Sequence, residues 1–159
     1  MTTKADYTPD EWAALVRSPL VVGAAISLAD PGGPFEIAKE STAVLRTVQE
    51  PTADQPELVA SVKAELTAMA EQRENPLGDF RPQGGNPGQQ VLDELRSVNA
   101  ILTGKATPEE ATAFRAWLAK AAKDAANAAK EGGFMGIRAV RVSEGEQHML
   151  DELGKVLAG

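Results

Sequence analysis

Apolar residues recur every three to four positions along most of this chain, and this spacing constrains its fold more than any other feature. Such a period places them on one face of an α-helix, whereas a half-buried strand would alternate them every second residue. The stretches that show the pattern are Ile37 to Val48, Leu58 to Met69, Val91 to Leu102, Phe114 to Ala125 and Met149 to Leu157. The sequence therefore predicts an all-α fold without a sheet.

Capping motifs mark where two of these helices begin. Thr8-Pro9-Asp10-Glu11 and Thr107-Pro108-Glu109-Glu110 each place a hydroxyl at the N-cap, proline at the first helical position and glutamate at the third. In such a capping box the hydroxyl and the carboxylate each accept a hydrogen bond from a backbone N–H group. Tyr7 and Trp12 are spaced to close a hydrophobic staple over the first box. We expect a helix to start at each motif.

The segment Leu20 to Ala29 is apolar on all sides, which indicates a short helix at the centre of the molecule. Ser18-Pro19 precedes it and is interpreted as its start. Asp54 to Glu57 and Ser143 are further expected starts. We therefore predict six or seven helices in one compact bundle, a single domain that spans residues 1–159.

A loop is predicted between two helical halves, because three prolines and three glycines fall within residues 75–87. Either it is a linker, or it is ordered by packing of Phe80 onto the bundle. The single aromatic side chain favours the ordered loop.

Composition argues against several classes of protein. The chain has no cysteine, which excludes disulfide scaffolds, cysteine zinc sites and thiol nucleophiles. A net charge of -7 and an aromatic content of 4% disfavour nucleic-acid binding. The start of the chain lacks a secretory pattern, and the ten-residue run Leu20 to Ala29 is too short to cross a bilayer. We expect a cytoplasmic protein without a membrane or nucleic-acid partner.

The glycine-rich junction between residues 132 and 143 is the candidate interaction surface. Glycines let backbone N–H groups turn toward a ligand, and a helix start at Ser143 favours an anion. The candidate residues are Gly132, Gly133, Phe134, Gly136, Arg138 and Arg141. Phe134 would anchor a partner, and the two arginines would supply charge. The alternative is an extended segment tucked against the bundle, with both arginines in solvent or paired with carboxylates.

An acidic cluster is the candidate metal site. Glu36 and Glu40 are four residues apart and share a helical face, and Asp30 comes just before the preceding turn. Carboxylates at this spacing can hold a hard cation such as Ca²⁺ or Mg²⁺. The alternative is that these acids only stabilise the first turn of a helix.

No catalytic motif is present: there is no Gly-x-Ser-x-Gly, His-Glu-x-x-His or EF-hand pattern. His148 is the one histidine, and it has no second histidine or cysteine with which to form a site. We interpret it as a surface or boundary residue, and no enzymatic activity is predicted.

Two resemblances bear on function. The stretch Glu131-Gly-Gly-Phe-Met-Gly-Ile-Arg-Ala-Val-Arg-Val-Ser143, with Thr8-Pro-Asp-Glu-Trp-Ala-Ala-Leu15, resembles a group of small uncharacterised bacterial helical proteins, which implies no activity. Ile26-Ser-Leu-Ala-Asp30 with Glu36 and Glu40 is similar to the helix–acid–loop pattern of tellurite-resistance TerB-like proteins. That resemblance implies an all-helical fold, cation binding and a role in stress response. This chain has Asp30-Pro31 where that pattern usually has Asp-Gly.

The sequence thus leads to one main expectation and two alternatives. We expect a non-enzymatic interaction or scaffold protein that binds an unknown protein or a second copy of itself, with the contact at residues 132–142. The first alternative is a cation-binding stress-response protein that uses Asp30, Glu36 and Glu40, with a divalent cation as cofactor. The second is a small-molecule or anion binder at residues 132–143.

Overall fold

The computed structural model describes residues 2–29, 44–51, 55–82, 86–130 and 144–158. Within these ranges every regular element is a helix and no strand occurs, which confirms the all-α prediction. The elements are a 3-10 helix η1 (Lys4–Asp6) and the α-helices α1 (Pro9–Ala29), α3 (Glu57–Glu71), α4 (Pro87–Lys105), α5 (Pro108–Lys130) and α6 (Glu144–Leu157). Residues 44–49 are also helical and are called helix 44–49 below.

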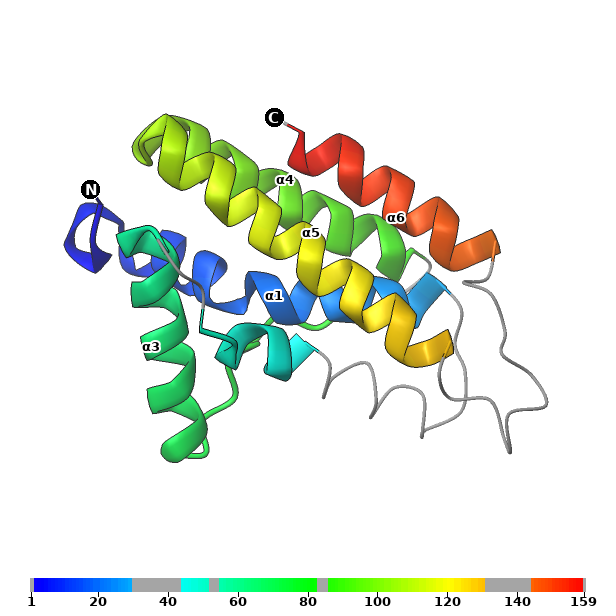
Figure 1. Ribbon diagram of the computed structural model, residues 1–159, viewed down its shortest axis with the longest axis horizontal. Helices are drawn as coiled ribbons and strands as arrows, with labels where there is room; N and C mark the ends of the chain where they lie inside the picture. The colour runs from blue at the N-terminus through cyan, green and yellow to red at the C-terminus, as the bar shows by residue number, and fades with distance from the viewer. Residues whose placement is uncertain (1, 30–43, 52–54, 83–85, 131–143, 159) are drawn as a thin grey trace.

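Helix α1 is the element around which the others are arranged. It contacts α3, α4, α5 and α6, and α6 also contacts α4 and α5. Figure 1 shows α4 and α6 on one side of α1, α5 crossing α1 diagonally, and α3 extending away on the other side. The helices before and after the loop at residues 75–82 are therefore in direct contact with one another.

The core is built from the apolar faces that the sequence spacing predicts. Its largest fully buried side chains include Leu15, Ile26, Leu58, Leu95, Leu102, Phe114, Leu118 and Leu153. Leu45 is an exception, because it was predicted on a buried face and is 47% exposed. Helix 44–49 is short, so it buries Val44 and Val48 while Leu45 points away from the core.

Helix α1 continues through Ser18 and Pro19, so the predicted helix start at this point was wrong. The predicted short central helix Leu20 to Ala29 is the second half of this longer helix. Proline has no N–H group, so Pro19 leaves the carbonyl oxygen of Leu15 without its usual helical donor. The Ser18 hydroxyl donates to that oxygen instead, at 2.7 Å. The serine therefore supplies the missing hydrogen bond and the helix is not interrupted.

The full length of α1 changes the argument about membranes. Its 21 residues contain a window of mean hydropathy 1.6, long and apolar enough to cross a membrane by length and composition alone. Of that window 61% is buried inside the bundle, as in the core helix of many folded proteins. The length of the run Leu20 to Ala29 therefore no longer argues against a membrane-spanning helix. The absence of a membrane partner stays a prediction.

Both capping boxes form as predicted. The Thr8 N–H donates to Glu11 at 2.8 Å, and the Glu11 N–H donates to the Thr8 hydroxyl at 3.2 Å. Thr107 and Glu110 repeat this exchange at 3.1 and 3.2 Å. The Tyr7 and Trp12 rings lie 5.9 Å apart, which confirms the staple. Helix α3 begins after Pro56 without a side-chain cap, and Ser143 lies outside the described residues.

The described part of the proline- and glycine-rich loop, residues 75–82, packs on the bundle. Phe80 lies against the core, and the Arg17 guanidinium is 5.7 Å from the centre of its ring. Arg17 also pairs with Glu94 of α4 at 2.6 Å. These contacts agree with the ordered-loop interpretation for this part of the loop.

Candidate functional site

The residues predicted from sequence to form functional sites fall outside the described part of the chain. This holds for the cation ligands Asp30, Glu36 and Glu40 and for the whole glycine-rich junction. The junction residues concerned are Gly132, Gly133, Phe134, Gly136, Arg138 and Arg141. Both sites therefore stay predictions.

Among the described residues, no group of three or more histidine, aspartate and glutamate side chains lies close enough to hold a metal ion. His148 is exposed on α6, which agrees with its interpretation as a surface residue. The candidate sites that the structure does define are hollows between helices.

The first hollow is an apolar groove of about 270 Å³ beside α1. It lies where helix 44–49 and the loop at residues 77–82 approach the second half of α1. Its lining residues are Leu20, Gly23, Ala24, Ser27, Leu28, Val44, Leu77 and Pro82. We call this the apolar groove below.

Close approach of two helices forms one wall of the apolar groove. A Cβ atom added to Gly23 would lie 2.9 Å from Cγ2 of Val44, closer than side chains normally approach. Glycine at this position therefore lets helix 44–49 contact the backbone of α1 directly.

Two leucines leave apolar surface exposed at or beside the apolar groove. Leu28 lines it and is 38% exposed, and Leu45 follows the lining residue Val44 and is 47% exposed. These two are the exposed large hydrophobic residues of the described part of the chain. One exposed leucine needs no explanation, but an exposed leucine in an apolar hollow with a second one beside its wall indicates a surface that favours an apolar contact.

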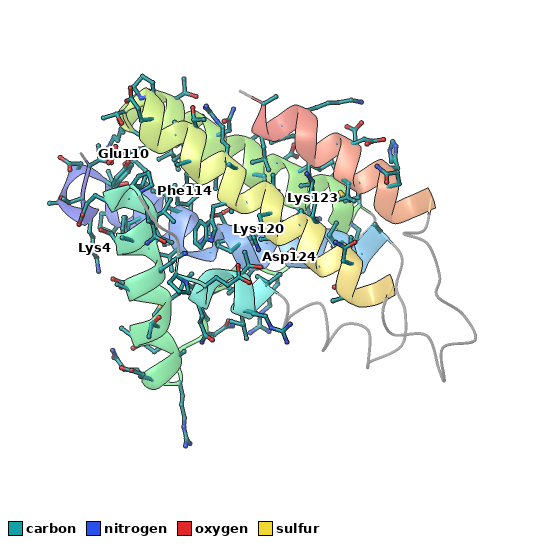
Figure 2. The ribbon with its side chains drawn as sticks, in the orientation of Figure 1. Lys4, Glu110, Phe114, Lys120, Lys123 and Asp124 are labelled. Carbon is teal, nitrogen blue, oxygen red and sulfur yellow. The ribbon has the colours of Figure 1, made fainter. Side chains whose placement is uncertain are left out.

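The second hollow is polar and lies between helix 44–49 and α5. It measures about 270 Å³, and its lining includes Arg46, Thr47, Glu50, Lys120 and Asp124. Lys120 Nζ lies 2.7 Å from a carboxylate oxygen of Asp124 and 3.0 Å from one of Glu50, and the Thr47 hydroxyl also donates to Asp124. Figure 2 shows Lys120 and Asp124 together along α5.

The polar side chains of this hollow connect helix 44–49 and Glu50 to α5. Hydrogen bonds to Asp124 and then to Glu50 raise the pKa of Lys120, so this lysine stays charged at neutral pH and is a poor nucleophile. The Lys120 and Glu50 side chains are about half exposed, so the pair contributes little to the free energy of folding. We interpret the cluster as a fastening of helix 44–49 to α5.

Lys63 of α3 is the buried cation beside this cluster. It is 9% exposed, and its Nζ donates to the backbone oxygen of Glu50 at 2.8 Å and to Gln55 at 2.7 Å. Burial lowers the pKa of Lys63, and the nearby charge of Glu50 opposes that shift. Its ammonium group also lies 5.7 Å from the centre of the Trp117 ring. These contacts hold the segment around residues 50 and 55 onto α3 and α5.

Comparison with protein-family models, with curated proteins and with solved structures finds no match for this chain. The two resemblances described above therefore remain expectations from sequence.

The apolar groove was not predicted from the sequence. Its walls come from α1, from helix 44–49 and from a loop more than 30 residues further along, and no local spacing relates these segments. The available signals were Leu28 near the end of an apolar helix and Leu77 within a loop of turn-forming residues.

Proposed function

We propose that this chain is a non-enzymatic protein-interaction module that binds an apolar segment of a partner in the apolar groove. The observation that carries the proposal is an apolar hollow of about 270 Å³ whose lining includes the exposed Leu28, with a second exposed leucine, Leu45, next in the chain to the lining residue Val44. Fully burying an exposed leucine side chain contributes about 1.5–3 kcal/mol. Leu28 and Leu45 are 38% and 47% exposed, so a partner that covers both gains roughly the contribution of one such side chain.

The partner that fits this surface is an amphipathic segment with basic residues flanking its apolar face. Helices of that kind dock their apolar side chains into hydrophobic grooves. The chain carries 23 acidic and 16 basic residues, so a basic segment is attracted to it. A second copy would bring a further net charge of -7, and self-association is therefore less favoured than a basic partner.

The test compares three baits in an extract of the organism that produces the protein: the natural chain, a groove variant and a control. The groove variant carries Leu28→Glu and Leu45→Glu. The control carries Ala64→Glu and Ala100→Glu, which add the same charge at exposed helix positions that do not line the groove. We expect one partner to be retained by the natural chain and the control and reduced roughly tenfold with the groove variant.

Binding of the purified partner, or of a synthetic peptide from its basic apolar segment, must then be measured directly by calorimetry. A partner that binds all three chains equally well, or that lacks such a segment, would contradict the proposal. Analytical ultracentrifugation of the natural chain alone measures its oligomeric state. A dimer that the groove variant abolishes would show that the occupant is a second copy instead.

A further inference from the structure

We propose that a third hollow, between α5 and α6, binds a small carboxylate with an apolar body through Arg115. This site is separate from the apolar groove and does not depend on the interaction proposed there. Its cavity measures about 320 Å³, within the range of small-molecule sites. The lining residues are Thr112, Arg115, Ala116, Ala119, Gly154, Leu157 and Ala158.

Most of this lining is small and apolar. Ala116 and Ala119 on α5 face Gly154 and Leu157 on α6 across the hollow, and the absence of larger side chains leaves the space open. The polar side chains of the lining are Thr112 and Arg115. An apolar body with one charged end matches this distribution.

The guanidinium group of Arg115 is held in position by neutral side chains. Its Nε donates to Asn99 Oδ1 at 2.7 Å, and one of its terminal nitrogens donates to the Thr103 hydroxyl at 2.9 Å. The Thr103 hydroxyl donates in turn to the Asn99 backbone oxygen at 2.9 Å. A guanidinium has five N–H donors, so these two bonds leave three for a ligand.

No carboxylate of the described residues forms an ion pair with Arg115. Lys4, Arg17, Lys105 and Lys120 each have an acidic partner, whereas within the described ranges Arg115 shares the lack of an ion pair with Arg46, Arg73 and Arg81. Arg115 differs from those three because two side-chain hydrogen bonds orient its guanidinium group. An oriented arginine without a counter-charge is suited to bind a carboxylate through two parallel hydrogen bonds.

The C-terminal end of α6 lies at the same hollow and carries a partial negative charge of about half an elementary unit. The arginine carries a full positive charge and contacts the ligand directly. The balance therefore favours an anion whose carboxylate reaches Arg115 and whose apolar end lies between Ala119 and Leu157.

The experiment titrates the isotope-labelled protein with hexanoate, hexanol and hexylamine and follows the NMR signals of residues 112–119 and 154–158. We expect hexanoate to bind through charged hydrogen bonds to Arg115. Hexanol and hexylamine lack the carboxylate that accepts these bonds. We therefore expect hexanol to bind at least tenfold more weakly and hexylamine to leave the signals unchanged. Equal binding of hexanoate and hexanol would overturn the assignment to Arg115.

Three variants complete the test. Arg115→Gln removes the charge, and we expect a loss of at least tenfold in hexanoate affinity. Arg81→Gln removes an exposed arginine elsewhere and should leave that affinity unchanged. Ala116→Leu fills the hollow at an exposed position and keeps the Arg115 hydrogen bonds, so it decides the matter if Arg115→Gln fails to fold. Unchanged hexanoate affinity in Ala116→Leu, or an equal loss in Arg81→Gln, would contradict the proposal.

Discussion

Glu110 shows how a buried carboxylate is accommodated in this chain. It is 4% exposed and accepts hydrogen bonds from the backbone N–H groups of Thr2, at 2.7 Å, and Thr107, at 3.1 Å. The Thr2 hydroxyl adds a third bond at 3.0 Å. One side chain thus caps α5 and fastens the start of the chain to it, and Figure 2 places Glu110 at that end of the molecule.

These contacts predict a dependence of stability on pH. Burial alone would raise the pKa of Glu110, but the hydrogen bonds from Thr2 and Thr107 outweigh it and lower that pKa below the ordinary 4.5. The stabilisation is therefore fully present above the ordinary pKa that this carboxyl has in the unfolded chain, and it is lost as the pH falls through the lower pKa of the folded chain.

We expect Glu110→Gln to lower the free energy of unfolding by about 1 kcal/mol at pH 7 and to weaken its decline below pH 4.5. Urea unfolding at pH 7, 5, 4 and 3 measures both effects. Glu109→Gln is the matched control, because Glu109 is the exposed neighbour in the same helical turn. If both variants follow the natural chain down to pH 3, Glu110 does not have the role assigned to it.

At the scale of whole elements, the Ser18 hydroxyl compensates for Pro19 within the continuous helix α1. The carbonyl oxygen of Leu15 is in the core region and accepts from the Ser18 hydroxyl because Pro19 has no donor. We expect Ser18→Ala to leave that oxygen unsatisfied and to lower the free energy of unfolding by about 1–3 kcal/mol. Chemical denaturation followed by circular dichroism measures the change.

Ser97→Ala is the matched control for this helix. The Ser97 hydroxyl donates to the Asp93 backbone oxygen on exposed α4 surface, where water can replace it. We expect a change within about 0.5 kcal/mol. Equal losses in the two variants would show that the Ser18 hydroxyl does not substitute for the missing proline donor.

The elements that the sequence predicted well are those set by neighbouring residues. The two Thr-Pro capping boxes formed because their partners lie within one turn, and Leu95 and Leu118 are buried because the 3.6-residue period selects them. Ser18-Pro19 was misread because a serine followed by a proline fits two structures. The pair can start a helix, or it can lie inside one when the serine hydroxyl replaces the hydrogen bond that proline cannot donate. The apolar groove and the Arg115 hollow depend on contacts between distant segments, which local spacing does not encode.

At the scale of the molecule, the described helices form one bundle organised around α1. The described helices on both sides of the 75–82 loop share a core, and α1 contributes fully buried residues to it, among them Leu15, Val21 and Ile26. Both proposed binding sites are hollows between helices, so each depends on that packing.

Native-state hydrogen exchange of backbone amides tests this claim most directly. We expect the slowest amides of α1, around Val21 and Ile26, to open with the same free energy as those around Leu95 in α4 and Leu118 in α5, within about 1 kcal/mol. That result would mean that the three helices unfold together as one unit. Exchange of α1 through a separate opening of lower free energy, while α4 and α5 stay protected, would contradict it.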